Sequence, residues 1–162
     1  MSYTIYTDGG YSNKNSVGAF AYIMLDGNGN VVKRGAWKIE DETNNRAELK
    51  AIITAVHHLP ETNADVTVIS DSKYALNTLS GEWARNKNTD LFEVWDRVLQ
   101  SKQPKITYNW VKGHNGDPYN EECDRMCNTA AGIDLNAEFA KYKNKPMFIG
   151  DISPRYKPEI NG

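Results

Sequence analysis

The chain has 162 residues, which is enough for one domain with a sizeable hydrophobic core. Its formal net charge of −2 and its 40% hydrophobic content are ordinary for a globular protein, and the mild acidity argues against binding nucleic acid through bulk positive charge. The sequence contains no run of about 18 apolar residues, so no membrane span is expected.

Three strands are predicted at the start of the chain. Residues 2–8 are mostly β-formers and run directly into Asp8 and two glycines, which indicates a strand that ends there in a tight turn. Residues 17–25 and 30–39 are also rich in strand formers, and the DGNG sequence at 26–29 is a strong hairpin signal. We therefore expect three successive antiparallel strands.

A helix is predicted over residues 43–59, where apolar residues recur at helical spacing up to Pro60. Thr43 and Asn44 are both suitable N-caps, and the sequence leaves the choice open. Glu48 lies three and four residues before apolar positions, so we expect it on the face of the helix that packs inward.

A strand followed by a helix is predicted next. Residues 65–70 (DVTVIS) form a short β-branched run that ends at Asp71, and residues 72–79 have a helical pattern. This order implies a strand parallel to its neighbour, with Asp71 at its carboxyl end. If the first strand lies beside it, Asp8 and Asp71 come together at the edge where open sheets bind ligands.

The rest of the chain continues the alternation. Asp90 and Glu93 are spaced as a capping box for a third helix, and residues 105–111 alternate as a strand with two unlike faces. Asn120 is the predicted N-cap of a last helix that runs to about residue 131, with Asp124 in its first turns.

The start of the chain and its two cysteines bear on where the protein acts. No basic segment precedes an apolar stretch at the N-terminus, so we expect no secretory signal. Cys123 and Cys127 are four apart in a predicted helix, where a disulfide would fit poorly. A reduced protein in the cytoplasm is the simplest interpretation.

Four acids lie at the edges of predicted elements: Asp8, Glu48, Asp71 and Asp124. Clustered carboxylates repel one another and are tolerated mainly where a cation neutralises them. Oxygen ligands of this kind suit Mg²⁺, with Mn²⁺ as its common substitute. Two such ions about 3.5–4 Å apart can activate a water and stabilise the leaving oxygen of a phosphodiester.

Each acid also has an ordinary structural explanation when it is considered singly. Asp8 could be a turn residue, Asp71 a helix cap, and Asp124 an acid favoured by the helix dipole. Glu48 could form a surface pair with Arg46 or Lys50. The hypothesis of a metal site therefore depends on the joint pattern.

Five stretches resemble, in order, the motifs of type 1 ribonuclease H. They are Tyr6-Thr7-Asp8-Gly9, residues 43–49 (TNNRAEL), 70–74 (SDSKY), 110–114 (WVKGH) and 120–124 (NEECD). The resemblance implies an α/β ribonuclease H-like fold over residues 1–132, with a five-stranded mixed sheet of three antiparallel and two parallel strands flanked by helices. It also implies Mg²⁺-dependent endonucleolytic cleavage of the RNA strand in RNA–DNA hybrids, leaving 5′-phosphate and 3′-hydroxyl ends.

The resemblance also implies roles for individual residues. The four acids match the metal-binding acids of the family, which hold two ions per site. His114 matches the histidine of a mobile loop that assists proton transfer or product release, a role suited to a pKa near neutrality. Residues that match substrate contacts are Thr43, Asn44, Asn45, Lys73 and Asn120.

Two departures from the family pattern concern substrate binding. Where many bacterial members have a long basic protrusion, residues 82–102 contain four acids and four basic residues, which predicts weaker or differently organised hybrid binding. Lys73 stands where several relatives have glutamine, so a phosphate contact replaces a minor-groove contact.

In the loop after the first strand, either Asn13 or Asn15 is the candidate contact.

Two other functions remain open from the sequence: a DNA nuclease on the same fold, and a non-catalytic hybrid-binding module. The match beyond the acids disfavours the first, and the presence of all four acids disfavours the second. We expect a monomer with no membrane partner, and we expect residues 133–162 to form a C-terminal extension, packed on the domain or partly disordered.

Overall fold

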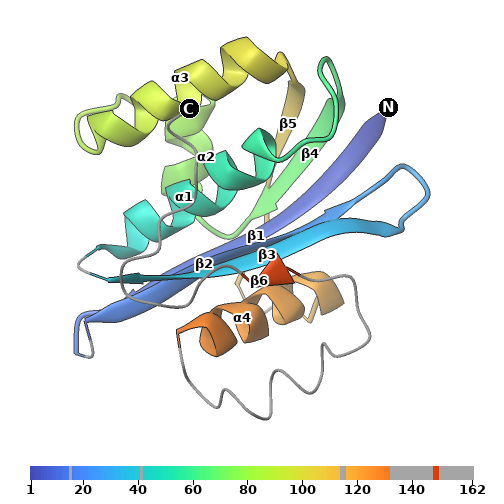
Figure 1. Cartoon of the computed structure of the whole chain (residues 1–162). Coiled ribbons are helices and arrows are strands. Elements are labelled where there is room, and N and C mark those ends of the chain that lie inside the picture. The colour runs from blue at the N-terminus through green and yellow to red at the C-terminus, as the bar shows by residue number, and fades with distance from the viewer. Residues whose placement is uncertain (15, 41, 114–115, 132–147, 150–162) are drawn as a thin grey trace.

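The computed structural model describes residues 1–14, 16–40, 42–113, 116–131 and 148–149 (Figure 1). Its central feature is one mixed sheet with strand order β5-β4-β1-β2-β3-β6. The strands are β1 (Ser2–Ser12), β2 (Val17–Leu25), β3 (Val31–Glu40), β4 (Asp65–Ser70), β5 (Lys105–Trp110) and β6 (Phe148–Ile149).

The predicted five-stranded mixed sheet is confirmed. Strands β1, β2 and β3 pair antiparallel, and β4 lies parallel to both β1 and β5. The sequence did not predict β6, a two-residue strand that pairs in parallel with β3 at Gly35 and Ala36. Apart from β6, the predicted C-terminal extension (residues 133–162) lies outside the described residues.

Within the described residues, four helices cover the two faces of the sheet: α1 (Asn44–His57), α2 (Lys73–Leu79), α3 (Thr89–Lys102) and α4 (Pro118–Ala130). Helices α1, α2 and α3 lie on one face and α4 lies on the other (Figure 1). Strand β2 is buried on both faces along nearly its whole length, because α1 packs on one side of it and α4 on the other. Of the described helices, none is long and apolar enough to cross a membrane.

The core has two parts, one on each face of the sheet. The larger part packs β-strand aromatics such as Phe20 and Trp37 against Ile52 of α1 and Trp95 of α3. The smaller part packs small and aliphatic side chains of β2 and β3 against the apolar side of α4, including Met126. The β-formers and the helical apolar spacing in the sequence thus both serve burial, the main stabilising contribution to the fold.

The sequence predicted that the first strand ends at Asp8, but β1 extends beyond it. It continues through both glycines to Ser12, paired with β2 throughout. Gly9 does not form a turn. It allows α1 to pack closely against β1, because a Cβ at this position would lie 2.7 Å from the carbonyl carbon of Ala47 in α1. The first glycine of the Asp-Gly-Gly signal is therefore explained by helix-to-strand packing.

Two helix starts also differ from the prediction. Asp117, not Asn120, caps α4, because Pro118 occupies the first helical position and the Asp117 carboxylate accepts from the backbone N–H groups of Tyr119 and Asn120. At α3 the capping box of Asp90 and Glu93 does not form. Asn88 is the N-cap, in the left-handed region at φ 59° and with no side-chain cap bond.

Arg46 explains why Asp90 is not used as a cap. Its guanidinium donates to both carboxylate oxygens of Asp90, at 2.9 and 2.8 Å, and also to Glu42 at 2.6 Å. The Asp90 carboxylate is engaged by Arg46, and Asp90 itself lies in the first turn of α3, after the N-cap. At α1 the open choice of cap is settled by Thr43, whose hydroxyl accepts from the backbone N–H of Arg46.

Candidate active site

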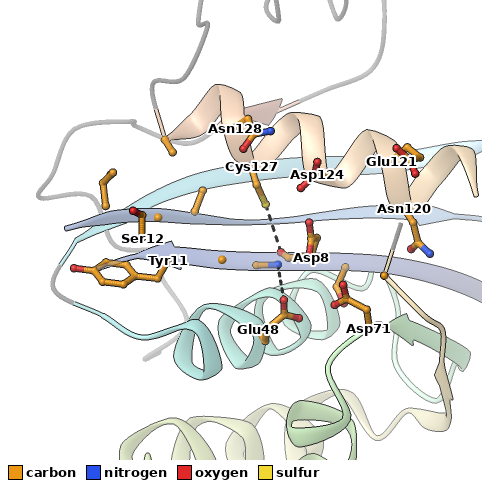
Figure 2. A pocket seen from close by; sticks show the side chains of 18 residues that line it. Asp8, Tyr11, Ser12, Glu48, Asp71, Asn120, Glu121, Asp124, Cys127 and Asn128 are labelled. Atoms are coloured by element: carbon orange, nitrogen blue, oxygen red, sulfur yellow. Dashed lines mark hydrogen bonds between the residues drawn. The ribbon is translucent and has the colours of Figure 1, made fainter. Parts of the chain in front are cut away.

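Three carboxylates meet where β1 and β4 separate. The parallel pairing of β1 with β4 ends at Tyr6 and Ile69, so Asp8 on β1 and Asp71 just after β4 lie beside each other past the last paired residues. Glu48 reaches the same place from α1. One ligand atom from each of these three acids lies within 4.8 Å of the other two, and Figure 2 shows their carboxylates facing the same space.

Glu48 is buried and held by two hydrogen bonds. The backbone N–H of Gly9 donates to Oε1 at 3.0 Å, and the Ser70 hydroxyl lies 3.5 Å from Oε2. The surface-pair explanation of Glu48 is therefore wrong, since Arg46 and Lys50 both pair with Glu42. The explanations of Asp8 as a turn residue and of Asp71 as a helix cap also fail, because Asp8 lies within a strand and Ser72, not Asp71, caps α2.

Asp124 approaches from the opposite side, on α4. Several contacts fix α4 to β1 near Asp8: the rings of Tyr6 and Tyr119 have centroids 5.1 Å apart, and the Cys127 thiol donates to the Asp8 carbonyl at 3.6 Å. Asp124 is outside the three-acid group but lines the same cavity. Of the four acids that the sequence singles out, three lie within mutual coordinating distance and the fourth faces them across the cavity (Figure 2).

A buried ion pair adds a further anchor for α4. Arg34 on β3 lies 3.1 Å from Glu122, and both side chains are less than a tenth exposed. Cys123 is also buried and donates to the Tyr6 carbonyl at 3.5 Å. Both cysteines are free thiols, as the sequence predicted.

The carboxylates of the cluster lie close enough to raise one another's pKa. Burial, together with the charges of Asp71 and Asp124, raises the pKa of Asp8 to about 7. Burial and the charges of Asp8 and Asp71 also raise the pKa of Glu48 well above its usual range. Carboxylates in this situation favour either a proton or a bound cation. An all-carboxylate oxygen set fits a hard divalent ion such as Mg²⁺ or Mn²⁺.

The cluster opens into a concave surface of about 400 Å³. Besides the four acids, its lining includes Gly10 to Ser12 of β1, Gly113, and Asn120 and Asn128 of α4. Gly113 lies so close to the cluster that a Cβ there would be 3.0 Å from Oδ2 of Asp71. His114 itself lies outside the described residues.

The five candidate substrate residues differ in how they lie relative to this cavity, and only Asn120 belongs to its lining. Thr43, Asn44, Asn45 and Lys73 are exposed, and Asn120 lines the cavity. Two of them also have structural roles: Thr43 is the N-cap of α1, and the Asn44 side-chain oxygen accepts from the backbone N–H of Tyr11 at 2.6 Å. Asn44 therefore links the start of α1 to the end of β1.

Among the lining residues that the sequence did not single out, three lie on α4. Glu121, Cys127 and Asn128 all lie on α4 and face the cavity beside Asp124. Their positions three before, three after and four after Asp124 place them on one helix face. This helical spacing from Asp124 could have predicted that the three residues line the site. It could be applied only once the structure showed which face of α4 is turned toward the acids.

A model of the RNase H family matches residues 1–132. The chain belongs to the RNase H family. The matched residues contain the four acids and strands β1 to β5, so the family and the site coincide along the chain.

Members of the RNase H family from several bacteria are similar over most of their length. The protein named Ribonuclease H from Desulforamulus reducens is 35% identical over 141 residues, covering 79% of this chain and 86% of its own. The Ribonuclease H of Campylobacter concisus is 35% identical over 135 residues, covering 79% and 91%. The Ribonuclease HI of a Synechocystis species is 31% identical over 165 residues and covers 93% of both chains.

Proposed function

We propose that this enzyme hydrolyses the RNA strand of RNA–DNA hybrids, leaving 5′-phosphate and 3′-hydroxyl ends. The observation that supports this most is the group of Asp8, Glu48 and Asp71, whose ligand atoms lie within 4.8 Å of one another at the base of an open cavity. The chain's membership of the RNase H family supports the substrate class.

We propose that the site holds two Mg²⁺ ions, with Mn²⁺ as a substitute, on Asp8, Glu48, Asp71 and Asp124. When bound, such ions supply an activated water and stabilise the oxygen that leaves the phosphodiester. The protein's own contribution is to keep the ligands in place. Gly9 and Ser70 orient Glu48, while the contacts of α4 with β1 set the position of Asp124.

His114 is proposed to assist proton transfer or product release, because an imidazole titrates near neutrality. It directly follows Gly113, which lines the cavity beside the cluster. Thr43, Asn44, Asn45, Lys73 and Asn120 are proposed to contact the hybrid. The asparagine amides both donate and accept, as the recognition of a 2′-hydroxyl requires, and Lys73 provides a charge for a phosphate.

We propose that the hybrid is bound without a basic protrusion after α2. Arg85, one of the two cations nearest that position, is already used within the fold. It donates to the carbonyl oxygens of Thr78 and Leu79, pairs with Asp96 and lies over the ring of Phe92. Its charge is therefore partly compensated.

We further propose that residues 1–132 form the catalytic domain, that residues 133–162 are an extension of it, and that the protein acts as a cytoplasmic monomer. All four acids come from one chain, so the site needs no second copy. Two buried free thiols are compatible with a reducing compartment. Size-exclusion chromatography with light scattering at working concentration tests the oligomeric state.

One experiment separates the proposed activity from its alternatives. The protein is incubated with end-labelled RNA–DNA hybrid, duplex RNA or duplex DNA, in Mg²⁺, Mn²⁺ or chelator. We expect cleavage of the RNA strand of the hybrid alone, in either metal and not in chelator. Cleavage of duplex DNA would indicate a DNA nuclease instead, and hybrid binding without cleavage would indicate a binding module.

A further inference from the structure

Trp110 is the last residue of β5, and burial does not explain its presence there. Its side chain is 45% exposed, although tryptophan is usually placed where most of its surface is covered. Trp83 is similarly exposed, at 48%. The two residues differ in what they contact, and the contacts of Trp110 lead directly to the acidic cluster.

The indole of Trp110 binds the backbone of a cluster residue. Its Nε1–H donates to the carbonyl oxygen of Asp71 at 3.1 Å. The next residue, Val111, donates its backbone N–H to the carbonyl of Ser70 at 3.0 Å. The end of β5 thus binds two successive carbonyls, that of the last residue of β4 and that of the residue after it, the second of them through a side chain.

The face of the same indole contacts a cation on the other side of Asp71. Nζ of Lys73 lies 4.4 Å from the centre of the Trp110 ring. Tryptophan is the ring that binds a cation most strongly in this way. The Trp110 side chain therefore contacts both Asp71 and Lys73, the two neighbours of Ser72, which caps α2.

Asp71 is the acid of the cluster that most needs such support. Glu48 is buried, and Asp8 lies within a strand that pairs with β2 before and after it, but Asp71 is exposed and lies in a bend between β4 and α2. Its carboxylate is held near two others of the same sign, so repulsion favours its displacement toward solvent. A backbone hydrogen bond at Asp71 opposes that displacement.

We propose that Trp110 is a positioning residue for metal binding: its indole N–H holds the Asp71 backbone so that the carboxylate stays in coordinating position beside Asp8 and Glu48. The inference rests on the proposed function, since it assumes that these acids bind the catalytic ion. Residues that orient ligands in this way typically change metal affinity by about 10–100-fold when they are replaced.

The test compares Trp110→Phe, which keeps an aromatic ring but lacks the N–H, with Trp83→Phe as the control of matched exposure. Mn²⁺ is titrated calorimetrically into the full-length, substrate-free protein. We expect the Kd for Mn²⁺ to rise about tenfold in Trp110→Phe and to stay unchanged in Trp83→Phe. At saturating Mn²⁺ the KM for hybrid should equal that of the parent, while the Mn²⁺ concentration for half-maximal cleavage rises.

An unchanged Kd in Trp110→Phe, or an equal rise in Trp83→Phe, would overturn the proposal. So would a lower melting temperature in chelator with no change in Kd, because that would mean Trp110 serves only folding. A parent protein that binds Mn²⁺ but leaves hybrid uncut would overturn the proposed function alone. A parent that does not bind Mn²⁺ at all would overturn both.

Discussion

The backbone N–H of Gly9 donates a 3.0 Å hydrogen bond to Oε1 of Glu48, and this bond joins the central strand to the first helix inside the acidic cluster. Gly9 can make it because it has no side chain, and α1 passes where a Cβ would be. The residue next to Asp8 thus both allows the helix to approach and orients the second acid. The absence of a side chain at Gly9 thus explains both the close packing of α1 on β1 and the orientation of the Glu48 carboxylate.

Replacing Gly9 with alanine should therefore weaken both stability and metal binding. The added Cβ would lie 2.7 Å from backbone atoms of Ala47, so α1 must move away from β1. We expect a loss of about 1–3 kcal/mol in the free energy of unfolding, as is typical of overpacking. Urea denaturation measures it. Gly10→Ala is the matched control, because a Cβ there has nothing within 4 Å and should leave stability nearly unchanged.

Asp8→Asn should abolish cleavage while leaving the fold intact. The substitution removes a charge from a cluster in which burial and two neighbouring carboxylates already raise the pKa of Asp8 to about 7. The melting temperature in chelator should therefore be at least that of the parent, and its rise on adding Mg²⁺ should be smaller. Differential scanning fluorimetry and a hybrid cleavage assay measure these effects. Near-normal cleavage by the variant would refute the proposed site.

His114→Ala should slow turnover and leave measurable activity. Under the proposed function, an auxiliary proton carrier contributes about 10²–10⁴-fold to the rate, whereas the proposed metal ligands are required for the reaction. Single-turnover and steady-state rates on labelled hybrid distinguish a slower chemical step from slower product release. His57→Ala is the control, since no role in cleavage is assigned to it. Complete loss of activity in His114→Ala would contradict the auxiliary role.

Arg34→Met should be strongly destabilising because it leaves Glu122 buried without its cation. The two side chains are 3.1 Å apart and less than a tenth exposed. Removing one member of such a pair typically costs about 3–5 kcal/mol. Thermal and chemical unfolding measure the loss. The double variant Arg34→Met with Glu122→Leu should recover most of it; a double variant no more stable than the single one would mean that the pair has another role.

His58 should make stability depend on pH in the acidic range. Its Nδ1 lies 2.7 Å from the Tyr22 hydroxyl, and burial together with His57, Lys33 and Lys102 lowers its pKa to about 4. Because the folded-state pKa is below the unfolded value of about 6.5, the unfolded chain binds the proton first. Stability from this group is present above pH 6.5 and is lost as the pH falls toward 4.

The measurement is the free energy of unfolding at several pH values between 4 and 7. The parent should lose stability more steeply toward low pH than His58→Leu does. His57→Gln should retain most of the parent's pH dependence, since it leaves the buried imidazole in place. Equal slopes for the parent and His58→Leu would contradict the prediction.

The strand and helix pattern follows largely from local sequence. Residues 17–25 and 65–70 are strands with the bounds that their β-formers predicted, and the hairpin at 26–29 joins antiparallel strands. Element ends were harder, because they depend on partners far along the chain. Asp90 is drawn from its predicted cap by Arg46, and Asn120 is displaced as a cap by Asp117.

By itself, the sequence determined which residues could form the site: acids placed at the edges of alternating elements, and the motifs that resemble the family. Only the tertiary structure decided that Asp8, Glu48 and Asp71 meet while Asp124 faces them from α4, and that Gly9 and Trp110 hold the cluster. The reason is physical. Local propensity depends on neighbours along the chain, whereas the repulsion and hydrogen bonding of these groups depend on distances that only sheet pairing and helix packing set.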